Sequence, residues 1–107
     1  MELISREELK EKLDRKDDFK LAMVLGDWQF RAMHIPGSLN ISAPEIAHEL
    51  LDLDEEIVVY CSNPACAASV IAYDRLTAHG YKKVRRYAGG ISDWEESGYP
   101  LEGDMVK

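Results

Sequence analysis

A short run of β-branched residues near the middle of the chain constrains the fold more than any other feature. Ile57-Val58-Val59-Tyr60 is continuous and apolar, which is typical of a strand buried on both faces of a parallel sheet. Parallel strands need crossover connections, and these are usually helical. The run therefore predicts an α/β domain with a mainly parallel sheet.

The rest of the chain alternates between strand-like and helix-like patterns. Apolar stretches predict further strands at 19–25, 39–41 and 84–87. Ser5 and Glu8 form a capping-box pattern that opens a short amphipathic helix carrying Leu9 and Leu13. Further helices are predicted at 27–33, from Pro44 with Ile46, Leu50 and Leu51 on one face, at 67–79, and, after a Gly89-Gly90 turn, from a Ser92 cap through Trp94. This alternation is typical of the α/β class.

Length and charge indicate how many domains the chain forms and which classes of partner are not expected. The 107 residues predict a single domain, 1–107, which needs neither a disulfide nor a metal to fold. Thirteen basic against twenty acidic residues give a net charge of −7, which argues against a nucleic-acid binder. No apolar run reaches the length of a membrane span, and residues 1–5 lack a signal-peptide pattern. We therefore expect a cytoplasmic protein without a membrane or nucleic-acid partner.

Cys61 directly follows the central strand and precedes the helix predicted at 67–79. The carboxyl end of a parallel strand is where open α/β sheets bind ligands. The next helix directs unpaired N–H groups and partial positive charge to the same place. Both effects favour a thiolate, so we predict that Cys61 has a lowered pKa and acts as a nucleophile that a persulfide can occupy. The alternative is a buried, inert cysteine at a strand end.

Two separate segments of the sequence resemble the rhodanese family. The first is His-Ile-Pro-Gly-Ser-Leu-Asn-Ile at 34–41. The second comprises Val-Val-Tyr-Cys at 58–61, His-Gly-Tyr at 79–81, Tyr-Ala-Gly-Gly at 87–90, and then Trp94, Gly98 and Pro100. The resemblance implies a central five-stranded parallel sheet flanked by helices on both faces. It also implies sulfurtransferase activity without a cofactor or metal.

The resemblance assigns roles to the loop after the central strand. Cys61 matches the nucleophile, which accepts sulfane sulfur from thiosulfate, polysulfide or a protein persulfide and passes it to a thiophilic acceptor. The partners implied are a small sulfur-donor anion or a protein persulfide, together with a thiol reductant or an acceptor protein. The backbone around the nucleophile would cradle the persulfide, and this cradle consists of Ser62, Asn63, Ala65, Cys66 and Ala67.

The loop departs from the family pattern at three positions. Ser62, Pro64 and Cys66 stand where many active members have a basic residue, a glycine, and an arginine or hydroxyl residue. Without a cationic side chain in the loop, thiosulfate loses charge-assisted contacts. Pro64 also removes one backbone donor. Ala67 stands where related phosphatases and arsenate reductases carry an arginine, so phosphatase activity is not expected.

Cys66 is the second of only two cysteines, and its role has two interpretations. In a reducing compartment a close cysteine pair is more often chemical than structural. If the two Cα atoms lie within about 7 Å, Cys66 can resolve a Cys61 persulfide, releasing hydrosulfide and leaving a disulfide. Alternatively, Cys66 is a small apolar residue that faces the following helix.

Two other function classes stay open. A non-catalytic rhodanese-like module would bind a partner or sense redox state through Cys61 and Cys66. A thiol–disulfide oxidoreductase would cycle the same pair without sulfane sulfur. A zinc site is not expected, because two cysteines and scattered histidines lack a suitable spacing. The histidines are interpreted as structural: His34 bonded within its turn, His48 on a helix surface and His79 at a helix C-terminus.

The only basic cluster comprises Lys82, Lys83, Arg85 and Arg86. We interpret it as a solvated turn and strand edge. A second interpretation is that the cluster steers an anionic donor or an acidic partner toward the carboxyl end of the sheet.

Overall fold

A computed structural model describes residues 1–41 and 51–106. Its sheet is wholly parallel, with the order β2-β1-β3-β4. The strands are β1 (Lys20–Met23), β2 (Leu39–Asn40), β3 (Glu56–Tyr60) and β4 (Lys83–Tyr87). All four coincide with predicted strands, and β3 lies inside the sheet as its continuous apolar sequence indicated. The predicted α/β class is thereby confirmed.

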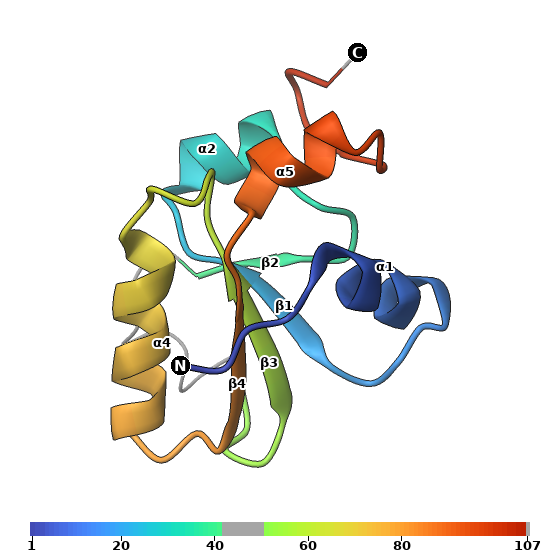
Figure 1. Ribbon diagram of the computed structural model, residues 1–107. Coiled ribbons are helices and arrows are strands. Elements are labelled where there is room, and N and C mark those ends of the chain that lie inside the picture. The colour runs from blue at the N-terminus through green and yellow to red at the C-terminus, as the bar shows by residue number, and fades with distance from the viewer. Residues whose placement is uncertain (42–50, 107) are drawn as a thin grey trace.

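The fifth position of the sheet holds a segment too short to form a strand. The N-terminal segment runs along the outer edge of β4 (Figure 1) and pairs with it through one parallel bridge, Leu3 to Arg86. Two backbone hydrogen bonds join the segments, from Arg86 N–H to the Glu2 carbonyl (2.9 Å) and from Ile4 N–H to the Arg86 carbonyl (3.0 Å). The described residues therefore form four strands and a bridged fifth segment, where the resemblance implied five strands.

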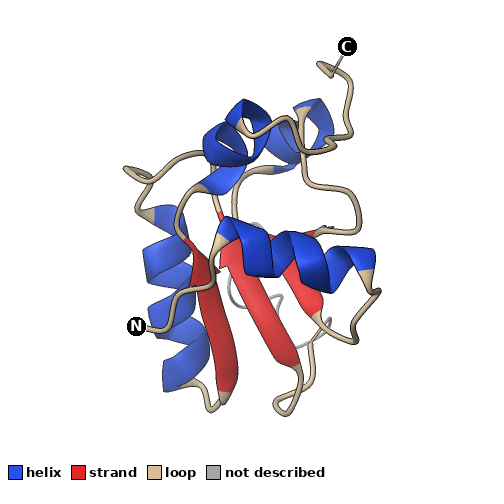
Figure 2. Ribbon diagram, turned by 45° about the vertical axis from the view of Figure 1, so that its right-hand side comes forward, coloured by secondary structure: helices blue, strands red, loops and turns tan. Residues whose placement is uncertain are grey.

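Helices cover both faces of this sheet, as expected. They are α1 (Arg6–Asp14), α2 (Asp27–Ala32), α4 (Ala68–Ala78) and α5 (Gly90–Glu96). On one face, Ala72 and Leu76 of α4 pack against Ile57 and Val59. On the other, Leu9 of α1 and Trp94 of α5 pack against Val58 and Tyr60; Figure 2 shows α1 crossing this face. Alternate residues of β3 thus serve two cores. No helix in the described ranges is both long and apolar enough to cross a membrane.

Two predictions about helix ends need correction. Ser92 does not cap the last helix: α5 begins at Gly90 with Gly89 as its N-cap. Gly90 has a φ of 67°, and this backbone freedom lets the chain enter the helix directly after β4. Ser5 does cap α1, since its Oγ accepts from Glu8 N–H (3.1 Å). The Glu8 carboxylate, however, pairs with Arg85 across the sheet edge, so the capping bond runs only from Glu8 N–H to Ser5 Oγ.

The helix predicted from Pro44, with Ile46 and Leu50, lies outside the described residues, as does His48. Leu51, at the end of that prediction, is buried in the same core as α4.

Candidate active site at the loop between β3 and α4

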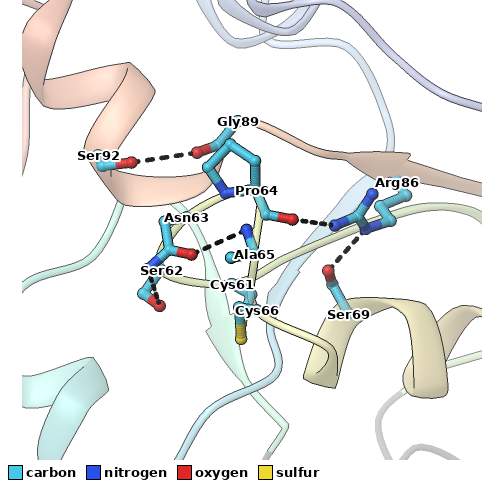
Figure 3. The surroundings of a disulfide bond; sticks show 10 residues. All are labelled: Cys61, Ser62, Asn63, Pro64, Ala65, Cys66, Ser69, Arg86, Gly89 and Ser92. Carbon is cyan, nitrogen blue, oxygen red and sulfur yellow. Dashed lines mark hydrogen bonds between the residues drawn. A yellow bond between two sulfur atoms is a disulfide. The ribbon is translucent and has the colours of Figure 1, made fainter.

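The loop 61–67 connects the carboxyl end of β3 to the start of α4, where the sequence placed it. Cys61 is buried, with 1% of its surface exposed, and Cys66 is half-buried. The two residues are joined in a disulfide with a Cα–Cα distance of 6.3 Å. The loop therefore curls back on itself (Figure 3) and brings Cys66 to Cys61, which is the approach that a resolving role requires.

Asn63 organises the loop from within. Its side-chain Oδ1 accepts a hydrogen bond from Ala65 N–H (2.9 Å), and its carbonyl accepts one from Cys66 N–H (3.1 Å). An asparagine that bonds its own backbone two residues on is a common turn device. These contacts engage the backbone donors of Ala65 and Cys66, two members of the predicted cradle.

The start of α5 supports the loop from outside. Ile91 N–H donates to the Cys61 carbonyl (3.0 Å), and Ser92 N–H donates to the Ser62 carbonyl (2.8 Å). Gly90 lies so close that a Cβ built on it would be 2.6 Å from the Cys61 carbonyl oxygen. A glycine is thus required here both by its positive φ and by the approach of the loop. The sequence pattern had indicated only a tight turn at this position.

Three cradle residues keep a free backbone donor. Within the described part of the chain, the N–H groups of Ser62, Asn63 and Ala67 donate to no protein atom. Ala67 is also the N-cap of α4, and it makes no side-chain capping bond. The first turn of α4 therefore keeps the unpaired N–H groups and partial positive charge that stabilise an anion. This end of β3 can hold a negatively charged sulfur.

Arg86 is the site residue that the sequence interpretation missed. It belongs to the basic cluster expected to be solvated, yet it is only 9% exposed. From β4 its Nε donates to Ser69 Oγ (2.8 Å) and its Nη2 to the Pro64 carbonyl (3.5 Å); Figure 3 shows that carbonyl turned toward the guanidinium. The signal was strand alternation: Arg86 is in phase with Val84, which is buried against α4.

The other three basic residues of the cluster lie elsewhere. Lys82 and Lys83 are exposed, as expected. Arg85 points to the opposite face from Arg86 and forms a two-pronged ion pair with Glu8 (2.6 and 2.9 Å). Of these four residues, Arg86 is the one that hydrogen-bonds to the cysteine loop.

The second motif, at 34–41, reaches the site through Tyr60. The Tyr60 hydroxyl accepts from Ile35 N–H (3.0 Å) and shares a hydrogen bond with Ser38 Oγ (2.9 Å). Burial raises the pKa of Tyr60 to about 12, so the phenol stays neutral. The motif thus bonds to the last residue of β3, directly before Cys61.

His34 and His79 both bond backbone carbonyls of helices. His34 Nδ1 bonds the Phe30 carbonyl (2.7 Å) in α2, not an atom of its own turn as predicted. His79 Nδ1 bonds the Arg75 carbonyl (2.7 Å) at the C-terminus of α4, where it was expected. Among the residues that the structure describes, no three His, Cys, Asp or Glu side chains gather in a way that could hold a metal ion.

Comparison with known proteins agrees with this architecture. A family model described as "Rhodanese-like domain" matches residues 5–97. A Bacillus halodurans protein of known structure superposes with a TM-score of 0.89 at 21% identity, over 97% of this chain and 78% of that one. The rhodanese-like domain of an Anabaena protein gives a TM-score of 0.87 at 22% identity, over 98% of this chain and 81% of that one.

The chain is also similar to three curated proteins of different kinds. A thiosulfate sulfurtransferase of Pseudoalteromonas translucida is 31% identical over 75% of this chain and 76% of its own length. An HTH-type transcriptional regulator of Mycobacterium tuberculosis is 33% identical over 69% of this chain. A putative sulfur carrier protein of Bacillus subtilis is 28% identical over 85% of this chain. The match spans a third of the regulator and about half of the carrier.

Proposed function

This chain belongs to the rhodanese-like domain family, and on that premise we propose that it is a sulfurtransferase whose Cys61 carries sulfane sulfur as a persulfide. One observation carries the proposal: Cys61 directly follows β3 and opens a loop in which the N–H groups of Ser62, Asn63 and Ala67 donate to no described protein atom. Unpaired N–H groups at a helix start stabilise anions. The names of two relatives, a thiosulfate sulfurtransferase and a putative sulfur carrier protein, support sulfur transfer in general.

The transfer has two steps. The Cys61 thiolate attacks the sulfane sulfur of the donor, the bond between that sulfur and the rest of the donor breaks, and the leaving group takes the electron pair. An acceptor thiolate then attacks the outer sulfur, which regenerates the Cys61 thiolate. A polysulfide or a protein persulfide suits this loop better than thiosulfate, because Ser62, Pro64 and Cys66 supply no cationic side chain for a doubly charged donor.

We further propose that Cys66 resolves the persulfide. The Cys66 thiolate attacks the Cys61 Sγ, a disulfide forms, the bond to the outer sulfur breaks, and that sulfur leaves as hydrosulfide. In this step the Cys66 sulfur is oxidised to the disulfide level, which the Cys61 sulfur already has in the persulfide, and the outer sulfur is reduced to hydrosulfide, so no outside oxidant is needed. The disulfide and its Cα–Cα distance of 6.3 Å support this step. A thiol reductant must then reopen the disulfide before another cycle.

Intact-mass spectrometry on reduced, desalted protein tests both proposals. Polysulfide and thiosulfate are offered separately to the wild type, Cys66→Ala and Cys61→Ser. We expect Cys66→Ala to accumulate a one-sulfur adduct that cyanide removes, and Cys61→Ser to gain none. The wild type should instead return to the disulfide mass while releasing one hydrosulfide per chain.

The outcomes separate the two proposals. If Cys66→Ala gains no sulfur from either donor, Cys61 is not a sulfur carrier. If the wild type retains the adduct as long as Cys66→Ala does, Cys66 does not resolve it, although sulfur transfer stands. The relative yields from the two donors also rank polysulfide against thiosulfate.

The disulfide also favours one competing function, a redox-sensing module. Such a module would alternate between the disulfide and two thiols without carrying sulfur, and one relative carries this domain within a transcriptional regulator. Reversible oxidation by hydrogen peroxide together with an absence of persulfide from both donors would select this function.

A further inference from the structure

We infer that Arg86 is a positioning residue, which shapes the cysteine loop through Pro64 and supplies from β4 the positive charge that stabilises the anionic sulfur on Cys61. The inference rests on the proposed function, in that Cys61 is taken as the reactive thiol. It assigns a role to a strand residue outside the loop sequence.

The geometry of Arg86 links three elements. Its backbone lies in β4 beside the N-terminal segment. Its guanidinium reaches Ser69 Oγ in the first turn of α4 (2.8 Å) and the Pro64 carbonyl at the tip of the loop (3.5 Å). Ser69 is itself buried, with 1% exposed. The guanidinium therefore braces the loop against the start of the helix that would hold the sulfur anion.

The charge of Arg86 has no counterion in the described protein. No carboxylate in residues 1–41 or 51–106 lies within ion-pair distance of it. Its two acceptors, a hydroxyl and a carbonyl, are neutral, and its Nη1 donates to no described protein atom. A buried cation is costly unless an anion compensates it. A thiolate or persulfide on Cys61 is the anion that the neighbouring loop can generate.

This arrangement replaces a missing feature of the loop. Ser62 and Cys66 stand where many active family members place basic or hydroxyl side chains. Arg86 approaches the same loop from the sheet. Its guanidinium contacts the loop at Pro64, three residues after Cys61, and a nearby opposite charge favours the ionised form of a thiol. We therefore expect Arg86 to keep the Cys61 thiol ionised at a lower pH than the loop alone would.

The test measures the pKa of Cys61 without any sulfur donor, so its result is independent of whether sulfur transfer occurs. The reduced Cys66→Ala protein, with Cys61 as its one cysteine, is alkylated with iodoacetamide across pH 4–10, and the midpoint of the rate profile gives the pKa. The variants are Arg86→Gln, which keeps N–H donors but loses the charge, and Arg86→Lys, which keeps the charge but loses the planar set of guanidinium donors.

Arg85→Gln is the matched control, because Arg85 directly precedes Arg86 in β4 and pairs with Glu8 on the opposite face. We expect Arg86→Gln to raise the pKa of Cys61, Arg86→Lys to restore most of the shift, and Arg85→Gln to leave the pKa unchanged. Equal pKa values in Arg86→Gln and its parent, or an equal shift in Arg85→Gln, would overturn the inference.

Arg86→Gln removes a braced, buried side chain, so its folding is checked by circular dichroism. If it does not fold, Arg86→Lys decides the matter. The lysine retains the charge, and we expect the pKa of Cys61 to stay well below that of a free cysteine, about 8.5, while sulfur uptake from polysulfide slows. A pKa at the free-cysteine value in folded Arg86→Lys would refute the electrostatic role.

Discussion

The turn at 34–38 and the loop at 61–67 both border Tyr60 or Cys61, yet they are held in different ways. In the turn, three of the four N–H groups have acceptors: His34 donates to the Glu102 carbonyl, Ile35 to the Tyr60 hydroxyl and Ser38 to the Ile35 carbonyl. Within the described residues, only Gly37 N–H has none. In the loop, support comes through its carbonyls, and several N–H groups stay free. A turn that fixes a strand therefore uses most of its N–H groups in hydrogen bonds, whereas a loop that can bind an anion leaves several N–H groups unbonded.

The support of the loop through its carbonyls is most sharply tested at Gly90. Alanine there would meet the Cys61 carbonyl oxygen at 2.6 Å and would also have to adopt a φ of 67°. We expect Gly90→Ala to lower the free energy of unfolding by about 3 kcal/mol or more, since a strained φ alone costs roughly 1–2 kcal/mol. Urea unfolding of the reduced protein measures the change.

Gly98→Ala provides the control for Gly90→Ala. Gly98 has a similar φ of 75°, but nothing lies within 4 Å of its added Cβ. Gly98→Ala should therefore lower the free energy of unfolding only by the cost of the strained φ, about 1 kcal/mol. Equal losses at the two glycines would mean that the close approach to Cys61 contributes nothing.

Tyr60→Phe tests the turn instead of the loop. The substitution leaves Ile35 N–H and the Ser38 hydroxyl without their shared partner, and an unsatisfied buried donor costs about 1–3 kcal/mol. We expect that loss in urea unfolding, with an unchanged pKa of Cys61. The control is Tyr99→Phe, because the Tyr99 hydroxyl makes no hydrogen bond to any residue the structure describes. A large pKa change at Cys61 would show that the two regions are not independent.

The same tyrosine predicts an alkaline limit of stability. Burial raises the pKa of Tyr60 to about 12, whereas an unfolded tyrosine ionises near pH 10. The unfolded chain therefore loses its proton first, and stability falls as pH rises from about 10 to about 12, by up to about 1.4 kcal/mol per pH unit. Unfolding at successive pH values should show a shallower decline in Tyr60→Phe. An identical slope would assign the effect to other groups, such as Tyr87, whose pKa is also raised by burial.

The sequence predicted the parts of this site that follow from local pattern. The apolar run at 57–60 placed β3, and Cys61 therefore had to lie at the carboxyl end of the sheet. Arg86 and Gly90 were missed because their roles depend on neighbours distant in sequence: Pro64 and Ser69 for Arg86, and the Cys61 carbonyl for Gly90. Strand alternation predicts that Arg86 is buried, but it does not predict which groups the guanidinium binds.

A full fifth strand is not among the described residues, for a related reason. Family resemblance implied it, but only Leu3 completes a bridge with β4 before Ser5 starts α1. The helix cap thus ends the extended segment. Strand propensity alone does not show this limit, because the limit is set by the helix that begins after Ser5.

The smallest expected effect concerns Ser92, whose predicted capping role was wrong. Its Oγ lies 3.5 Å from the Gly89 carbonyl, a long hydrogen bond, whereas its backbone N–H donates to the Ser62 carbonyl at 2.8 Å. Ser92→Ala keeps that backbone donor, so we expect a loss below about 0.5 kcal/mol. Ser5→Ala, which removes a true cap, should cost about 1 kcal/mol. If Ser92→Ala costs as much as Ser5→Ala in thermal unfolding, the Ser92 side chain supports the loop at Ser62 together with its backbone N–H, and the support at this point does not come from the backbone alone.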